Sequence, residues 1–343
     1  MGWKRINEYV SMLERPVLGS EKFEGGDKFM ALCIDPSVKD DYKGIARVVN
    51  ERKGDVNVVG FVDRSKLILV ESDDLLKWNI LGDLKIKGID EVIKKFESEN
   101  IYFVGLEDPD IFVDDEETKH VYFTIAYKYK EGDDYKIYLG HASGKSLDNL
   151  VASDPIIDGI KEVAISPVSN NGYRYVLAES WFKEDEEGIA MIRANNMGKD
   201  WKFDKLVFDP AKKNSPSWCK GYASPCRFFD PSLVNIGENL LLGVCTGNSG
   251  EYTEDGVKKR GDFEPGLFVF DYKTGSIPWI AEESLFKDPL AKTITFASEL
   301  VTTSKHEAIL YAHPNDSFVR AYKLDISKLK KLVPNKFKSY ESF

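Results

Sequence analysis

Carboxylates and a proline interrupt an otherwise apolar run between Val104 and Phe112. The run reads Val-Gly-Leu-Glu-Asp-Pro-Asp-Ile-Phe, which places Glu107, Asp108 and Asp110 among residues that a strand would bury. Carboxylates are rarely buried unless they are paired or have a chemical role. One interpretation is therefore acid–base chemistry. The other is a turn at the entry of a strand, where proline fixes φ and aspartate bonds the backbone.

The composition indicates a folded globular protein. The chain has 343 residues, 42% of them hydrophobic and 12% aromatic, which is enough for one large core or two ordinary domains. The net charge of −10 argues against a general nucleic-acid binder, because phosphate backbones are held by clustered Lys and Arg. No apolar run has the length of a membrane span, and the first residues lack the apolar core of a secretory signal. We expect a cytoplasmic protein with no membrane or nucleic-acid partner, although a chain whose signal had been removed would look the same.

The cysteines do not predict a metal site. Cys33, Cys219, Cys226 and Cys245 include no CxxC pair, and the four histidines are scattered. We expect buried free thiols in a reducing compartment, whereas Cys219 and Cys226 could pair in an oxidising one. No metal and no cofactor are predicted.

Short β-type runs, separated by turns rich in Gly, Asp, Asn and Pro, recur as five similar units. Helical spacing is limited to residues 3–15, which end before Pro16, and to Ile89–Phe96. The first run of each unit covers residues 29–35, 104–112, 162–168, 226–234 and 294–301. The second covers 45–49, 121–128, 174–182, 240–246 and 308–313, and the third covers 66–71, 136–143, 188–194, 265–272 and 318–325.

Repeated units of antiparallel strands predict a β-propeller, with a period of roughly 60 to 70 residues. We predict an all-β, five-bladed β-propeller that forms a single domain over residues 1–343, with a short N-terminal helix at 3–15. Radial closure would remove the open sheet edges that a long all-β chain otherwise exposes. A pair of β-sandwiches is the alternative, but it does not explain five similar units. The predicted blades are 29–78, 104–150, 162–203, 226–279 and 294–326.

In a propeller the first strand of each blade lines the central channel, so polar residues in these strands converge on one pocket. Several acids in one partly buried pocket repel one another and their pKa values separate, which supplies a proton donor and an acceptor for glycosidic-bond cleavage. The alternative is that Asp35-Pro36-Ser37 and Asp230-Pro231-Ser232 are only turns. We favour the pocket for Trp181 and packing for Trp78, Trp201 and Trp279. The converging residues are Asp35, Glu107, Asp108, Ser166, Asp230, Ser298 and Glu299.

With these residues in place, the chain resembles glycoside hydrolase family 130, whose members are five-bladed propellers and many of which are phosphorylases or hydrolases of β-mannosides. Gly105-Leu-Glu-Asp-Pro-Asp-Ile111 is similar to the family's Gly-x-Glu-Asp-Pro-Arg-Ile motif, which places Asp108 on the catalytic acid. The chain also resembles the related glycosyltransferase family 108, whose mannosyltransferases and phosphorylases share this propeller. The resemblance further implies substrate-binding roles for Arg47, Arg64, Glu107, Lys161, His313 and Asp316.

Two positions differ from the family pattern. Asp110 stands where the family usually has Arg, and Ala178-Glu179 stand where its phosphorylases tend to have His-Arg. Both changes remove cations that a phosphate would need. A different clamp could come from Arg47, Arg64, Lys128, Lys161 and Arg174.

The sequence thus predicts a carbohydrate-active enzyme that makes or breaks a β-mannoside bond by inverting displacement, with Asp108 as general acid or base. We favour a mannoside phosphorylase or a mannosyltransferase, which would take a mannose-containing oligosaccharide and a sugar phosphate or nucleotide sugar, with inorganic phosphate as a possible co-substrate. A hydrolase is the alternative and needs a second carboxylate, for which Asp35, Glu179 and Asp230 are candidates. Two further alternatives are a propeller that binds a sugar or protein without catalysis, and a furanoside-cleaving propeller like those of glycoside hydrolase families 32 or 43.

Overall fold

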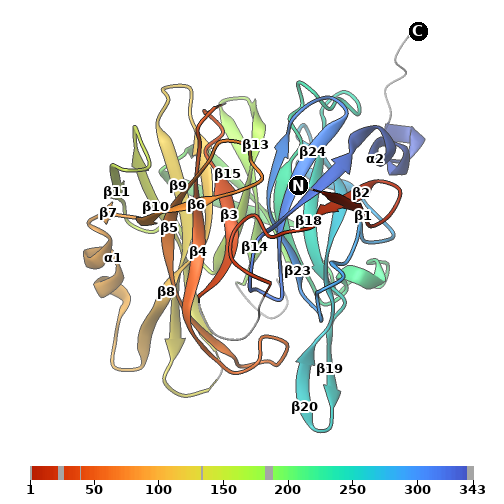
Figure 1. Ribbon diagram of the computed structural model, residues 1–343. Coiled ribbons are helices and arrows are strands. Elements are labelled where there is room, and N and C mark those ends of the chain that lie inside the picture. The colour runs from red at the N-terminus through yellow and green to blue at the C-terminus, as the bar shows by residue number, and fades with distance from the viewer. Residues whose placement is uncertain (1, 22–26, 39, 133, 182–187, 338–343) are drawn as a thin grey trace.

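The computed structural model describes residues 2–21, 27–38, 40–132, 134–181 and 188–337 (Figure 1). Its regular structure is mostly β-strand, so the predicted all-β class is confirmed. The first strands of the five units are β3 (Lys28–Ile34), β8 (Ile101–Val113), β13 (Ile160–Asn170), β17 (Tyr222–Phe228) and β23 (Thr295–Thr302). The second strands are β4 (Tyr42–Lys53), β9 (Lys119–Tyr129), β14 (Tyr173–Ser180), β18 (Leu240–Asn248) and β24 (Glu307–Pro314). The third strands are β5 (Val62–Ser72), β10 (Tyr135–Gly144), β15 (Gly188–Asn196), β21 (Phe263–Asp271) and β25 (Arg320–Asp325).

Outer strands complete the first four units. These are β6 (Asn79–Asp83) on β5, β11 (Leu150–Ala152) and β12 (Ile157–Asp158) on β10, β16 (Lys199–Phe208) on β15, and β22 (Ser276–Ile280) on β21. The short β7 (Ile86–Lys87) pairs with β11. The helices are α1 (Ile89–Phe96), at the predicted position, α2 (Ile326–Leu332), and the short 3-10 helices η2 (Ser217–Cys219) and η3 (Asn335–Phe337). None of the helices in the described part of the chain is long and apolar enough to cross a membrane.

The N-terminal segment forms strands, so the helix predicted at residues 3–15 is wrong. β1 (Trp3–Arg5) pairs with β2 (Val10–Leu13), and β2 pairs with β25 so that Val10 lies opposite Leu324. The apolar side chains of β2 are buried because they pack within the fifth unit. The fourth strand of that unit therefore comes from the opposite end of the chain.

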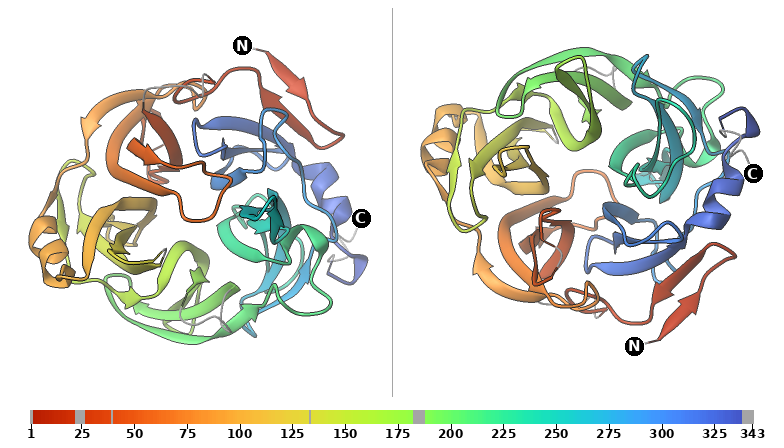
Figure 2. Two further views of the ribbon diagram at one scale, coloured as in Figure 1. Left: turned by 90° about the horizontal axis from the view of Figure 1, so that it is seen from below. Right: turned by 90° about the horizontal axis from the view of Figure 1, so that it is seen from above.

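The units are arranged around a common centre (Figure 2). Units three, four and five form separate antiparallel sheets, whereas units one and two are joined into a ten-stranded sheet by one parallel pair, Ser65 with Gly105. Five hydrophobic clusters among the described residues lie between consecutive units, including one between the fifth unit and the first. Each unit thus packs on both of its neighbours. The blade count itself stays a prediction.

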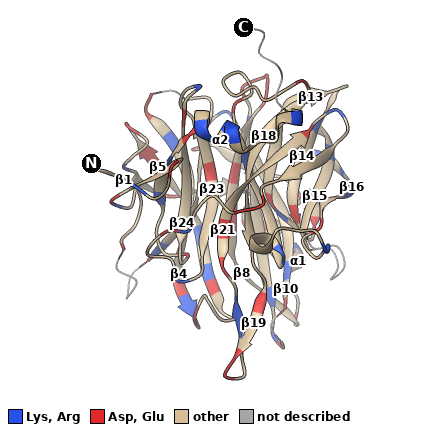
Figure 3. Ribbon diagram, turned by 90° about the vertical axis from the view of Figure 1, so that its right-hand side faces the viewer, with Lys and Arg blue, Asp and Glu red and all other residues tan. Residues whose placement is uncertain are grey.

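The apolar and cysteine predictions fit this packing. Trp78 and Trp201 are buried and Trp279 is partly buried against the core, as predicted, whereas Trp181 is 42% exposed. All four cysteines are buried free thiols. In the view of Figure 3, Lys and Arg are interspersed with Asp and Glu along the strands.

One end of the ring is covered by the loop between β4 and β5. Residues 247–262, whose Gly and charged residues predict a long surface loop, contain the hairpin of β19 (Glu251–Glu254) and β20 (Val257–Arg260). The hairpin projects from the body at that end (Figure 1). The amide of Val59 donates to the carbonyl of Lys258 (3.1 Å), and the amide of Arg260 donates to the carbonyl of Asn57 (2.9 Å). The β4–β5 loop, orange in Figure 2, is thereby fixed across the end of the ring.

Candidate active site

A β-bulge interrupts each of the five first strands in the part of the chain that the structure describes. The register shifts occur between Met30 and Cys33, Glu107 and Asp110, Lys161 and Val163, Pro225 and Arg227, and Ala297 and Glu299. A bulge adds one residue to a strand and redirects a side chain, and bulges are frequent next to active sites. Asp108 (φ 47°) and Glu162 (φ 51°) lie in two of these bulges, in a left-handed conformation that side-chain-bearing residues seldom adopt.

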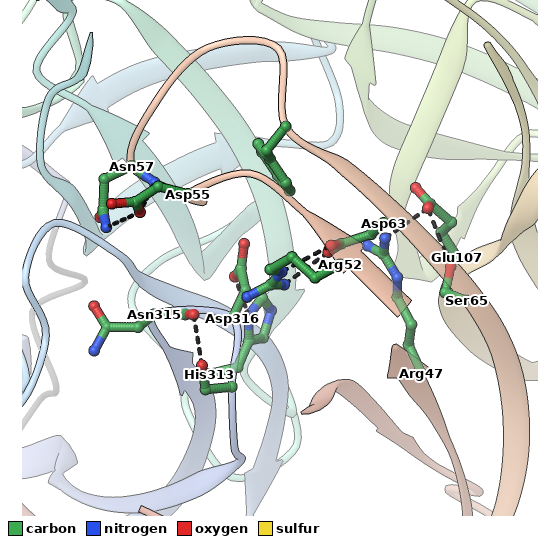
Figure 4. Close-up of polar contacts among 12 residues, drawn as sticks. Arg47, Arg52, Asp55, Asn57, Asp63, Ser65, Glu107, His313, Asn315 and Asp316 are labelled. Carbon is green, nitrogen blue, oxygen red and sulfur yellow. Dashed lines mark hydrogen bonds and ion pairs between the residues drawn. The ribbon is translucent and has the colours of Figure 1, made fainter. Parts of the chain in front are cut away.

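Asp108 is buried in an ionic cluster with Glu107 and Arg47. The Arg47 guanidinium on β4 donates to Glu107 Oε1 (2.5 Å) and to Asp108 Oδ1 (3.1 Å), and Ser65 Oγ donates to Glu107 Oε1 (3.1 Å). Figure 4 shows how Arg47 and Ser65 point toward Glu107. Burial raises the pKa of Glu107, the Arg47 charge opposes this, and the Asp108 charge adds to it. One guanidinium thus holds two adjacent carboxylates.

A second group extends the cluster toward the end of the ring. Arg52 donates to both carboxylate oxygens of Asp63 (2.7 Å each), and His313 Nδ1 lies 2.8 Å from Asp316 Oδ1 (Figure 4). Burial acts to raise the pKa of Asp316, but the His313 hydrogen bond and the nearby arginine charges hold it below its ordinary value. Since Arg47 is one of those charges, the two groups form one electrostatic unit.

The third unit contributes Lys161 and Glu179. Lys161 Nζ lies 3.4 Å from Glu179 Oε1 and 5.0 Å from the centre of the Trp181 ring. Glu179 is 1% exposed and also accepts hydrogen bonds from Tyr222 Oη and Trp181 Nε1. Burial raises its pKa, although Lys161 and the two donors oppose that shift. The charges of Glu179 and Asp108 act together on Lys161, so both carboxylates belong to the same site.

Glu162 belongs to this site and was missed from the sequence. Its pKa is raised well above the ordinary value by burial and by the Asp108 charge, and Lys161 opposes that shift. Strand alternation places neighbouring residues on opposite faces, so a Lys161 that faces the centre predicts an outward Glu162. The bulge removes that alternation. The one feature of the sequence that could have identified Glu162 as a site residue was its position next to Lys161.

A pocket of about 950 Å³ adjoins Arg52 at the covered end of the ring. It is formed by the β4–β5 loop together with residues at the start of β3, before β23 and after β24. Figure 4 labels Arg52, Asp55, Asn57 and Asn315 of this lining. Both acidic and basic side chains line it, and Arg52 connects it to the group of Asp63 and Asp316. Its lining comprises Glu21, Lys28, Arg52, Gly54, Asp55, Val56, Asn57, Lys292, Asn315 and Ser317.

Three predicted site residues have their contacts elsewhere. Asp35 forms an ion pair with Lys119 and accepts a hydrogen bond from Ser37 Oγ (2.6 Å). Asp230 is exposed and accepts from Ser232 in the same way, so both Asp-Pro-Ser segments form local turns. Arg64 is exposed and lies 3.4 Å from Glu51. The predicted residues that share the electrostatic network of Asp108 are Arg47, Glu107, Lys161, Glu179, His313 and Asp316.

The two other basic residues considered for a phosphate clamp also have their contacts elsewhere. Lys128 lies over the Tyr135 ring and donates to the carbonyl of Gly132. Arg174 donates to the carbonyls of Ser166 and Pro167. These contacts do not join either residue to the Asp108 cluster.

Asp110 belongs to a separate buried ionic group. It pairs with Arg227 on β17, whose guanidinium also binds Glu299 Oε1 (2.9 Å) and Oε2 (3.1 Å). Asp110, in the position where the related motif has Arg, is therefore matched by an arginine from another strand. Burial raises the pKa of Asp110 from 3.8 to about 7, with Arg227 opposing and Glu299 adding to the shift.

We expect Asp110→Asn to flatten the pH dependence of stability. The folded state holds a proton on Asp110 up to about pH 7, whereas the unfolded chain releases it near 3.8. The free energy of unfolding should therefore fall as pH rises between these values, by up to roughly 4 kcal/mol, and level off above pH 7. Urea unfolding at pH 4.5, 6 and 8 checks this, with the exposed Asp83→Asn as control. Equal slopes in wild type and Asp110→Asn would contradict it.

Comparisons with known proteins identify the fold but no close relative. No protein-family model and no curated protein matches the sequence. β-1,2-Mannobiose phosphorylase from Listeria innocua is similar in structure, with a TM-score of 0.67 at 13% identity over 94% of this chain and 99% of that one. MPT-4, a mannose phosphorylase from Leishmania mexicana, gives 0.61 at 16% identity over 95% and 91%. MPT-1, a GDP-Man-dependent mannosyltransferase from the same organism, gives 0.57 at 12% over 87% and 86%.

These structures represent the two families that the sequence resembles, so the resemblance is confirmed at the level of the fold. At these identities the likeness concerns the fold alone. What the chain does therefore depends on its own residues.

Proposed function

We propose that the protein is a five-bladed β-propeller that acts on β-mannoside bonds by inverting displacement, with Asp108 as general acid or base. The position of Asp108 carries this proposal. Asp108 lies in a bulge of β8, outside the regular pairing of that strand with β9. It is buried beside Arg47 and near Lys161 and Glu162. A turn residue without a chemical role would be satisfied by its own backbone, as Asp230 is.

The chemistry follows from the charges around Asp108. A general acid gives its proton to the leaving oxygen as the bond to the anomeric carbon breaks, and the same carboxylate removes that proton when the bond is made. Asp108 would do this directly or through a hydroxyl of the sugar. Arg47 and Lys161 would stabilise the carboxylate that remains after proton transfer.

The charge balance favours water over phosphate as the nucleophile. Near Asp108, the cations among the described residues are each engaged by carboxylates: Arg47 by Glu107 and Asp108, Arg52 by Asp63, and Lys161 by Glu179. Glu162 and Asp316 add further acidic groups. A phosphate needs cations that are not already neutralised. This arrangement supports hydrolysis ahead of the phosphorolysis or transfer favoured from the sequence.

Glu179 is the base that we propose for hydrolysis. It is a buried carboxylate held by Lys161, Tyr222 and Trp181, and its raised pKa suits a base that accepts a proton from water near neutral pH. The exposed Trp181 ring beside it could stack on a sugar face. No cofactor enters this reaction.

The test is incubation with β-1,2-mannobiose and other β-mannosides in phosphate-free buffer. We expect release of mannose, and NMR should show that the α-anomer is the first anomer formed from the non-reducing residue. The rate of release should not change when phosphate is added. Glu179→Gln should lower this rate by about 10²- to 10⁴-fold. Glu307→Gln is the matched control, since Glu307 is a partly exposed glutamate that pairs with Lys323 on the surface.

Other outcomes would redirect the assignment. Mannose 1-phosphate formed from phosphate, or chain growth from mannose 1-phosphate or GDP-mannose with mannose acceptors, would replace hydrolysis by phosphorolysis or transfer. No turnover of any of these substrates would favour a non-catalytic sugar-binding propeller or a different sugar.

A further inference from the structure

The pocket of about 950 Å³ beside Arg52 has no part in the reaction proposed above. Its volume lies at the upper end of the range for small-molecule sites, about 300 to 1,000 Å³, so it has room for more than one sugar ring. Lys28, Arg52 and Lys292 supply donors to its lining, and Glu21 and Asp55 supply acceptors. None of its lining residues in the described part of the chain is aromatic. The lining therefore suits a ligand with many hydroxyl groups, each of which can donate and accept.

One wall of the pocket is the β4–β5 loop, and this wall is fixed. Asp55 accepts hydrogen bonds from the amide and the side chain of Asn57 (3.0 and 2.7 Å), and Asn57 Oδ1 accepts from Thr293 Oγ1. Val56 is buried in the same hydrophobic cluster as Phe263. Together with the bonds to the β19–β20 hairpin, these contacts tie the loop to the fourth and fifth units. The pocket is therefore formed before a ligand arrives, as most ligand sites are.

A second wall comes from the segments that flank β23 and β24. Asn315 is 5% exposed, and its side chain donates to the carbonyl of Leu290 (2.8 Å) and accepts from the amide of Lys292 (2.7 Å). These two bonds fix the backbone of Lys292, whose side chain is exposed. The hydrogen bonds from Asn57 lower the pKa of Asp55, and the Lys292 charge adds to that shift. Lys292 thus lies close to the acid of the loop.

The pocket adjoins the catalytic cluster on the side of Asp108. Arg52, which lines the pocket, forms two hydrogen bonds with Asp63 (2.7 Å each), and lining residues stand on both sides of Asp316 in the sequence. The charges of Asp63 and Asp316 both act on Arg47, the arginine that donates to Asp108 (3.1 Å). Figure 4 shows this row of side chains from Asp316 through Arg52 and Asp63 to Arg47.

The base proposed for hydrolysis lies on another side of the centre. The first and fifth units line the pocket, whereas Glu179 lies on β14 of the third unit. Around the ring, the second unit separates the third from the first, and the fourth separates it from the fifth (Figure 2). In an inverting hydrolysis the acid and the base act on opposite faces of the sugar ring. A sugar held between Asp108 and Glu179 therefore directs its leaving group toward the pocket.

We propose that this pocket binds the leaving part of an oligosaccharide, so that the preferred substrate has at least three β-linked mannose residues, and that Lys292 determines this preference for length. The proposal rests on the proposed function and extends it from the bond to the length of the chain. One mannose residue lies between Asp108 and Glu179, and the next lies beside Arg52 and Asp316. The residues beyond these two lie between the β4–β5 loop and Lys292.

The test compares kcat/KM for β-1,2-mannobiose and β-1,2-mannotetraose. In the wild type we expect a value at least about 10-fold higher for the tetrasaccharide, since a hydrogen bond to a charged group contributes about that factor. Lys292→Ala should reduce this ratio by about 10-fold, and the fold should persist because Lys292 is exposed. Lys305→Ala is the matched control and should keep the ratio, since Lys305 is an exposed lysine at the other end of β23.

The position of an isotopic label shows which side of the bond the pocket serves. With mannotetraose that carries ¹³C at C1 of its reducing end, the first labelled product should be mannotriose, because three residues lie on the leaving side. Labelled mannose as the first labelled product would place the pocket on the other side of the bond and overturn the proposal. An equal loss of the ratio in Lys305→Ala would overturn the role of Lys292.

Binding separates failure of this proposal from failure of the proposed function. Calorimetric titration of the wild type, or of Asp108→Asn if the wild type turns the sugars over, should give a Kd about 10-fold lower for mannotetraose than for mannobiose. Lys292→Ala should remove that difference. Binding that depends on length, without turnover, would reject only the proposed function. Turnover with equal kcat/KM and equal Kd for both sugars would reject only the role of the pocket, and the absence of both effects would overturn both.

Discussion

Asp108→Asn is expected to lower turnover of β-mannosides by about 10²- to 10⁴-fold while leaving the fold intact. Asparagine has the same shape as aspartate and tolerates the left-handed backbone that Asp108 adopts, so the bulge in β8 should persist. It can still accept from Arg47 but cannot carry or remove the catalytic proton. KM should change little, because the loss concerns the transition state.

The measurement is kcat and KM on β-1,2-mannobiose together with thermal unfolding. Asp108→Gly serves as a second variant, since glycine also accepts a positive φ and removes the carboxyl group entirely. Both variants should fold and both should be inactive. Activity in either one that approaches wild type would place Asp108 outside the chemistry and favour a binding module.

Arg227→Met is expected to lower the free energy of unfolding by about 3 to 5 kcal/mol at pH 8. Arg227 lies between Asp110 and Glu299, which are 6% and 4% exposed, so its removal leaves two buried carboxylates without their cation. The amides of Ile34 and Leu300 would remain the main donors to Glu299. Urea unfolding measures the change.

The pH dependence of this variant gives an internal check. The folded state can hold a proton on Asp110 at the lower pH, so the loss from Arg227→Met should be smaller at pH 4.5 than at pH 8. Adding Asp110→Asn and Glu299→Gln to Arg227→Met should restore most of the lost stability, because no buried charge then remains unpaired. A loss that is equal at both pH values would attribute the effect to packing instead.

The strands could be predicted from the sequence because local alternation and turn residues decide them. The run predicted at 121–128 is β9 (Lys119–Tyr129), and the helix at 89–96 is α1. The errors arise where distant pairing overrides local pattern. Val10 and Leu13 have helical spacing, yet they are buried in a strand because β25 binds β2 from the far end of the chain. The run predicted at 226–234 is β17 (Tyr222–Phe228), which begins earlier and contains Pro225 beside a bulge.

The sequence predicted the kind of site, a cluster of acidic and basic residues around Asp108, but not all of its residues. Glu107 and Asp108 came from a short motif, Arg47 and Lys161 came from the family resemblance of two other segments, and all four lie in one electrostatic network. Asp35 and Asp230 each begin an Asp-Pro-Ser segment. This sequence alone does not distinguish a residue that lines the channel from a residue in a local turn. Glu162 was missed because a single inserted residue reverses the face of a strand.

The pairing of β2 with β25 has a consequence for how the protein is made. In this sheet β2 pairs with β1 on one side and with β25 on the other, so the pair of Val10 and Leu324 can form only after β25 has been translated. Contacts between such distant residues form slowly, since the entropy of closing a long loop must be overcome first. Ribosomes that stop before β25 would release a chain whose fifth sheet lacks its third strand, with the apolar edge of β24 open to other chains. The fifth sheet is thus complete only once β25 lies between β24 and β2.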